Sequence, residues 1–202
     1  QNLLYADREG HIGYQAPGQV PIRRSGNDGT VPSEGWKPAN DWTGDYIPFD
    51  GLPNELDPDE GFVVTANQAV TWPAYPQFLT DDWDRGYRSQ RIRDLIEAEQ
   101  DLTLTEMAEI QLDNRNPMAE TLVPHLMDVG GIDAYVEEGV DLLAEWDQND
   151  DADSGAAAFF NVVWARVLEL TFHDDLRERI HPKGGSRWIA VVENLLTKPA
   201  HV

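Results

Sequence analysis

The chain has 202 residues, of which 41% are hydrophobic, and its 37 acidic against 15 basic residues give a formal net charge of −22. Such acidity excludes nucleic acid as a partner, because binding to phosphates requires a basic face. The chain has no Cys, which rules out disulfides and thiolate chemistry within this segment, and no run approaches the roughly 18 apolar residues of a membrane-spanning helix.

The first part of the chain predicts short strands separated by turns. Residues 3–6 and 11–15 read as the two strands of a hairpin, with Asp and Gly supplying the turn between them. The Pro-punctuated stretch 16–36 indicates a loop, and residues 41–49 are aromatic and rich in turn formers. Residues 61–66, Gly-Phe-Val-Val-Thr-Ala, predict the next strand.

Asn67 ends this apolar strand, although Asn favours neither strands nor cores. From the residues alone two interpretations stay open: Asn67 turns the chain, which is the commoner role of Asn, or its amide binds a ligand. Arg88, which lies in a stretch with a helical pattern, also has two possible roles. It either belongs to a charged helix face or orients a carboxyl, carbonyl or amide group.

From about residue 85 the pattern becomes helical, with apolar residues at the spacing of one helix face. The expected helices cover residues 86–99, a stretch after Thr103 with Met107 and Ile110 on one face, a stretch around Val136–Leu143, a long stretch through Phe160–Leu168, and residues 188–196. Strands come first and helices follow, so the sequence predicts an α+β fold with a strand and loop portion at 1–84 and a helical domain at 85–202.

Several residues predict where these helices start. Thr103 followed by Glu106 is the signature of a capping box. Asp153 or Ser154 can cap the long helix. The Gly-Gly pair at 184–185 lacks the Lys-Ser/Thr pair of a phosphate-binding loop and indicates the start of the last helix.

The acidic stretch 147–158 resembles a calcium loop only in part. Asp147, Asn149 and Asp151 take the first three ligand positions of an EF-hand template. Ala152 and Ala158, however, stand where the template requires Gly and Glu. Helix capping explains this stretch better than calcium binding does.

The acidity itself has two explanations. A dense carboxylate surface is typical of a well-solvated, soluble protein. The scarcity of Lys, which occurs only at positions 37, 183 and 198, also favours a protein adapted to high salt.

Five ordered blocks resemble the β-chain of the penicillin amidase (penicillin acylase) family, whose members are N-terminal nucleophile hydrolases with an αββα core. The resemblance extends from residue 2 to about residue 196 and rests on blocks at matching separations rather than on one motif. The blocks are LLYADREGHIGYQAPGQVPIR, DWTGDYIPFDGLP, GFVVTANQAV, YPQFLTDDWDRGYRSQRI and LTLTEMAEIQLD.

The resemblance implies an enzyme whose precursor cleaves itself into two chains. The new N-terminal Ser of the β-chain attacks an amide carbonyl with its own α-amine as base, and water then releases the acid from the acyl-enzyme. The side chain of Asn67 would donate to the oxyanion. Arg88 would hold that Asn and keep the Ser amine neutral.

This nucleophile, the first oxyanion donor, the α-chain and the later β-strands are expected outside the chain, which would be an internal part of the β-chain and inactive alone. The implied substrate is an N-acyl compound: a β-lactam, an N-acyl homoserine lactone or an acylated amino acid. No catalytic cofactor is implied. A structural Ca²⁺ is, with ligands mostly in the missing parts and none assigned here, although Asp81 and Asp82 lie near its expected position. The family also implies a secreted or extracytoplasmic protein.

Two other functions compete with this expectation. One is a non-catalytic interaction module that uses its acidic helical surface for docking or oligomer contacts. The other is a calcium-dependent binding module. A Ser, Thr or Cys at the start of a processed chain upstream of Gln1 would distinguish the enzyme from both.

Overall fold

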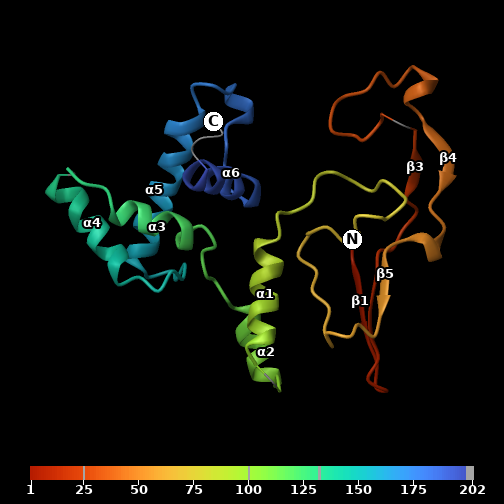
Figure 1. The fold of residues 1–202 in the computed structure, drawn as a ribbon, viewed down its shortest axis with the longest axis horizontal. Helices are drawn as coiled ribbons and strands as arrows, with labels where there is room; N and C mark the ends of the chain where they lie inside the picture. Colours follow the sequence, from red (N-terminus) through yellow and green to blue (C-terminus); the bar gives the residue numbers. More distant parts are fainter. Residues whose placement is uncertain (25, 100, 132, 199–202) are drawn as a thin grey trace. The chain divides into compact units, whose positions relative to one another are not determined.

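A computed structural model describes residues 1–24, 26–99, 101–131 and 133–198. The chain divides into two compact units, Gln1–Ser89 and Gln90–Val202, and each is described by itself (Figure 1). The strands lie in the first unit, and helices make up the regular structure of the second. This order confirms the α+β arrangement.

An antiparallel sheet of three strands lies in the first unit. Its strands, in the spatial order β1-β2-β5, are β1 (Leu3–Ala6), β2 (Ile12–Gln15) and β5 (Asn54–Leu56). The carboxylate of Asp7 accepts hydrogen bonds from the backbone N–H groups of Glu9 (2.9 Å) and His11 (3.0 Å), which fixes the turn between β1 and β2. The predicted hairpin is therefore confirmed.

A second sheet pairs β3 (Pro21–Arg23) with β4 (Trp42–Tyr46), and short 3₁₀ helices η1 (Pro38–Asn40) and η2 (Phe49–Gly51) flank β4. The sequence does not predict either strand. Pro21 at the start of β3 and Gly44 at φ +98° within β4 give both segments the composition of turns. Their pairing joins distant residues, so a local pattern cannot show it.

Residues 61–66, predicted as a strand, belong to neither described sheet, so this prediction is wrong. The nearest ladder contact is an isolated parallel bridge between Gln68 and Asp84. Apolar composition marks a segment that suits a strand, but a strand also needs a neighbour whose backbone completes its hydrogen bonds. In this segment the side chain of Gln68 supplies some of these backbone hydrogen bonds.

Six α-helices and one short 3₁₀ helix follow among the described residues. Their bounds are α1 (Tyr87–Glu97), α2 (Leu104–Gln111), α3 (Ala119–Met127), α4 (Ala134–Ala144), α5 (Gly155–Phe172), η3 (Glu178–Ile180) and α6 (Ser186–Thr197). The sequence predicts each of these α-helices except α3. That helix contains Pro124, and its N-cap residue Met118 makes no capping bond with its side chain. Oδ1 of Asn116 instead accepts from the N–H of Met118 (3.0 Å), a start signal that the sequence prediction missed.

The predicted start signals occur in the structure. Thr103 and Glu106 form a complete capping box at α2. The hydroxyl of Ser154, rather than Asp153, accepts a hydrogen bond from the N–H of Ala157 at the start of α5 (3.1 Å). Gly185, at φ +89°, directly precedes α6.

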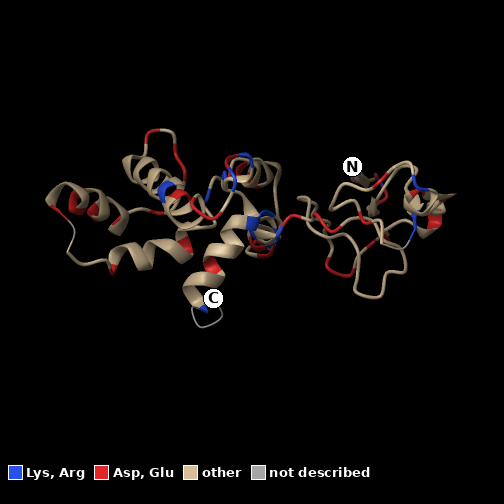
Figure 2. Cartoon of the chain, turned by 90° about the horizontal axis from the view of Figure 1, so that it is seen from above, with Lys and Arg blue, Asp and Glu red and all other residues tan. Residues whose placement is uncertain are grey.

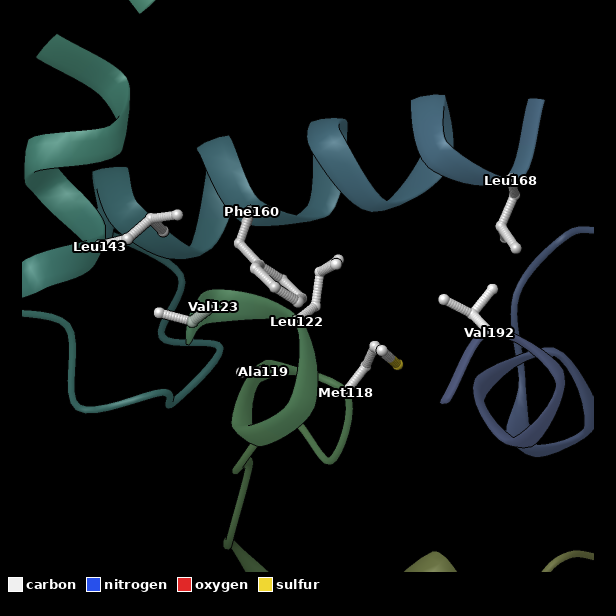
Figure 3. Close-up of a cluster of buried hydrophobic side chains, with 8 residues drawn as sticks. All are labelled: Met118, Ala119, Leu122, Val123, Leu143, Phe160, Leu168 and Val192. Carbon is white, nitrogen blue, oxygen red and sulfur yellow. The ribbon is translucent and has the colours of Figure 1, made fainter. Parts of the chain in front are cut away.

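Helix α5 carries the centre of the core of the second unit. Phe160 of α5 is fully buried and lies against side chains of α3, and Leu168 lies near Val192 of α6 (Figure 3). The full buried cluster is Met118, Ala119, Leu122, Val123, Leu143, Phe160, Leu168 and Val192. Burial of these apolar side chains is the main force that holds the helices together.

Among the described residues, α5 alone is long and apolar enough to span a membrane by length and composition. These two criteria are weak evidence, because core helices also meet them. The polar residues Asn161, Arg166 and Glu169 interrupt the apolar sequence of α5. Phe160 and Leu168 of this helix are buried in the core. Core packing therefore accounts for only part of its apolar composition, since Val162 and Leu170 of the same helix are exposed.

Acidic residues are spread along the whole chain rather than gathered in one segment. Figure 2 shows Asp and Glu positions in the helices and the loops of both units. Since 37 acidic residues face 15 basic ones, most carboxylates have no cationic partner of their own. Adaptation to high salt stays a prediction from this composition.

Candidate active site

Asn67 follows the apolar segment 62–66 and has a left-handed backbone, with φ +69°. Few residues without the freedom of Gly adopt this conformation, and Asn is one of those that do so most readily. Non-Gly residues held there often mark functional sites. Its side chain is exposed, whereas the preceding Ala66 is buried, so the bend turns Asn67 out of the packed segment.

Arg88, in the first turn of α1, lies directly against this bend. Its Nη2 donates to the backbone carbonyl of Ala66 (2.8 Å) and to Oδ1 of Asn67 (3.0 Å). The structure thus brings together the two site residues that the sequence singles out. Their contact lies wholly within the first unit.

This contact decides which end of the Asn67 amide is available. Oδ1 faces the guanidinium, because only the oxygen can accept a hydrogen bond. The NH₂ group then points away, and no described residue bonds to it. Asn67 therefore presents a neutral hydrogen-bond donor on an exposed bend.

Asp84 is a member of the site that sequence reasoning misses. Its N–H donates to the carbonyl of Asn67 (2.9 Å), and its Oδ2 accepts from Arg88 (3.4 Å). Its Oδ1 also accepts from the N–H of Gly86 (3.0 Å), just before α1. The one available signal is its position four residues before Arg88, the spacing of a helical ion pair.

The described residues form no group of three or more His, Cys, Asp or Glu side chains suited to a metal ion. In the acidic stretch, both oxygens of Asp150 accept hydrogen bonds from side-chain amides, those of Asn116 (3.0 Å) and Asn161 (2.9 Å). Asp147 likewise accepts from Asn149. The carboxylates of Asp147 and Asp150 are thus used within the fold, and a structural Ca²⁺ stays an expectation for the full protein.

Comparisons with known proteins agree on one family. The model of the family described as penicillin amidase matches residues 1–202. The penicillin acylase 2 proenzyme of Pseudomonas sp. (strain SE83) is 33% identical over 184 residues, which cover 90% of this chain. The acyl-homoserine lactone acylase QuiP of Pseudomonas aeruginosa is 31% identical over 206 residues, which cover 95% of this chain.

The chain spans about a quarter of the length of these relatives, 24% in each case. Among solved structures, the thermostable penicillin G acylase of Alcaligenes faecalis has a similar fold, with a TM-score of 0.65 and 22% sequence identity. The match covers 88% of this chain and 34% of the acylase chain. This likeness shows that the chain has the fold of the corresponding part of that acylase.

Proposed function

The chain belongs to the penicillin amidase family, and from this premise we propose that it forms part of an acylase that hydrolyses the amide bond of an N-acyl compound. The single observation that supports this most is the contact between Arg88 and Asn67. It fixes the Asn67 amide with its donor outward, as an oxyanion-binding group requires.

In the proposed reaction the nucleophile is an N-terminal Ser outside this chain. Its oxygen bonds to the amide carbonyl carbon while its proton passes to its own α-amine. The tetrahedral intermediate collapses, and the amine product leaves with that proton. Water then adds to the acyl-Ser ester in the same way, and the carboxylic acid is released.

Asn67 acts in both halves of this cycle. Each half forms a tetrahedral oxyanion, and a donor already in place stabilises that charge without reorganising in the transition state. The NH₂ of Asn67 is such a donor, since Arg88 and Asp84 hold its side chain and backbone before substrate arrives. Loss of one donor of this kind typically lowers kcat by about 10²–10³.

Arg88 has a second role in the proposal. A guanidinium near the α-amine of the Ser disfavours protonation of that amine, because like charges repel. The amine then stays available as a base. Arg suits this place better than Lys, because its charge is permanent and its longer side chain brings Nη2 to the acceptors of Ala66, Asn67 and Asp84.

The variants Asn67→Gly and Asn67→Ala test the proposal in the full protein. Gly adopts φ +69° without strain, whereas Ala pays about 1 kcal/mol or more for it. Both variants lack the donor, so both should lose about 10²–10³ in kcat on a chromogenic phenylacetyl amide or an N-acyl homoserine lactone. If Asn67 only turns the chain, Asn67→Gly keeps the activity of the unmodified protein, and the proposal fails.

The remaining parts of the proposal concern the whole protein. Its substrates are small N-acyl compounds, such as β-lactams with an acyl side chain or N-acyl homoserine lactones. The α-chain and the rest of the β-chain complete the site, so residues 1–202 alone should not hydrolyse a phenylacetyl amide above background. The protein works outside the cytoplasm, which cell fractionation tests, and any structural Ca²⁺ is held mainly by residues beyond this chain.

A further inference from the structure

The segment that leads to Asn67 has an unusual set of hydrogen bonds. Oε1 of Gln68 accepts from the N–H of Ala66 (2.6 Å), and Nε2 of Gln68 donates to the carbonyl of Val64 (2.7 Å). One side-chain amide thus uses both its donor and its acceptor on backbone groups two residues apart. This segment belongs to no described strand ladder.

The same two bonds occur in a parallel β-sheet. There a residue donates to a carbonyl of the neighbouring strand and accepts from the N–H two residues further along. The carboxamide of Gln68 therefore makes the bonds that a parallel neighbour would make around Thr65. It bonds this segment without a second strand.

These bonds also fix the bend at Asn67. Gln68 folds back over its own neighbour to reach Ala66 and Val64, so Asn67 lies inside the closed loop. From the other side, Arg88 bonds the carbonyl of Ala66 and the N–H of Asp84 bonds the carbonyl of Asn67. The loop is thus anchored on both sides of its left-handed residue.

We infer that Gln68 is a positioning residue for the reaction: its side-chain amide acts as a substitute strand that holds Asn67 in its left-handed conformation with the amide donor outward. This inference rests on the proposed oxyanion role of Asn67. Displacing a catalytic group by about 1 Å can cost up to about 10²-fold in rate. Loss of the Gln68 bonds should act through Asn67 in this way.

Gln68→Met tests the inference in the full, processed protein, because Met keeps the length of the side chain and loses both hydrogen bonds. With activity normalised to titrated active sites, kcat on a chromogenic phenylacetyl amide should fall by about tenfold or more while KM changes little. Gln90→Met is the matched control. Gln90 is exposed on α1 and bonds Asp94 of the same helix, so its loss should leave kcat unchanged.

The double variant Asn67→Gly/Gln68→Met separates positioning from a merely structural effect. If Gln68 acts through Asn67, adding Gln68→Met to Asn67→Gly causes no further loss of kcat. An equal loss in both backgrounds, or an unchanged kcat for Gln68→Met alone, would overturn the inference. If Asn67→Gly by itself keeps full activity, the proposed function fails instead, so the two failures are distinguishable.

A second variant guards against misfolding of Gln68→Met. Gln68→Leu also loses both hydrogen bonds but has a branched side chain of similar volume and brings no charge. It should show a loss of kcat similar to that of Gln68→Met, which again disappears in the Asn67→Gly background. Persistence of its loss in that background would likewise refute positioning through Asn67.

Discussion

Gly139→Ala should destabilise the packing of α4 on α5, although Ala is the better helix former. A Cβ on Gly139 would lie 2.2 Å from Cε2, 2.6 Å from Cζ and 2.7 Å from Cδ2 of Phe159. These distances are shorter than van der Waals contact by roughly 1 Å, since carbon atoms rest about 3.5–4.0 Å apart. The ring must turn away or the helices must separate.

Two opposing terms set the size of the effect. Replacing Gly by Ala inside a helix gains about 1 kcal/mol. Overpacking a well-filled contact costs about 1–3 kcal/mol, and three ring atoms in conflict place this case in the upper part of that range. The net expectation is a loss of about 1–2 kcal/mol, equivalent to a factor of about 5–30 in the population of opened states.

Hydrogen exchange measures this locally in the intact protein, where global unfolding need not be two-state. Peptides from α4 and α5 should exchange about 5–30 times faster in Gly139→Ala, and peptides from the β1-β2 hairpin should not change. In a Phe159→Ala background the clash is gone, so Gly139→Ala should slow exchange there. Slower exchange with Phe159 present would refute the packing argument.

Two further predictions concern the charged residues of α1. Arg88→Lys should lower kcat by about tenfold or more, because the bonds to Ala66 and Asn67 both come from Nη2 at the tip of the guanidinium and the shorter Lys side chain does not place its ammonium at that point. Arg93→Lys, in the same helix, is the control. Arg91 donates to both carboxylate oxygens of Asp113 (3.0 and 2.6 Å), which holds the pKa of Asp113 below its usual value of about 3.9. A depressed pKa stabilises the fold above pH 4 or so and loses that contribution as the pH falls through the lowered value. Asp113→Asn should therefore cost about 1 kcal/mol at pH 7, after allowance for screening at the half-exposed guanidinium, and progressively less as the pH falls below 4; a cost that is constant with pH would contradict the ion-pair assignment.

The helices are the part of the fold that the sequence predicts best, and the reason is local. The start of α2 is marked by the capping box of Thr103 and Glu106, and the start of α5 by Ser154. Each signal lies within four residues of sequence. Helix α3 contains Pro124, and its start depends on Asn116, whose side chain bonds a backbone N–H two residues later; its packing in the core identifies it more clearly than this short signal does. Stability that comes from tertiary contacts leaves little trace in a short window of sequence.

The strands are harder to predict than the helices, because their pairing joins distant parts of the chain. The hairpin of β1 and β2 joins neighbours through one turn, and its pattern is readable. Strands β3 and β4 pair across a long loop and look like turns, whereas residues 61–66 look like a strand and find no strand partner among the described residues. Whether a segment forms a strand depends on a partner strand that can be far away in the sequence, and the composition of the segment does not show which partner that is.

The sequence likewise predicts only part of the candidate site. Family resemblance identifies Asn67 and Arg88, but not Asp84 or Gln68, which hold them. The bonds of these two residues go mostly to backbone groups, and any residue supplies those. Sequence patterns therefore carry little record of such contacts, and only the coordinates of the bend reveal them.

The bend also explains why this position suits Asn. A left-handed residue between two anchored peptides favours Gly, Asn, Asp or His. Gly offers no side-chain donor, Asp would bring a negative charge towards an oxyanion, and the donors of His depend on its protonation. Asn alone combines tolerance of φ +69° with a neutral NH₂, while its oxygen remains for Arg88. The turn and the ligand-binding interpretations of Asn67 are therefore not rivals, since the turn is what carries the donor outward.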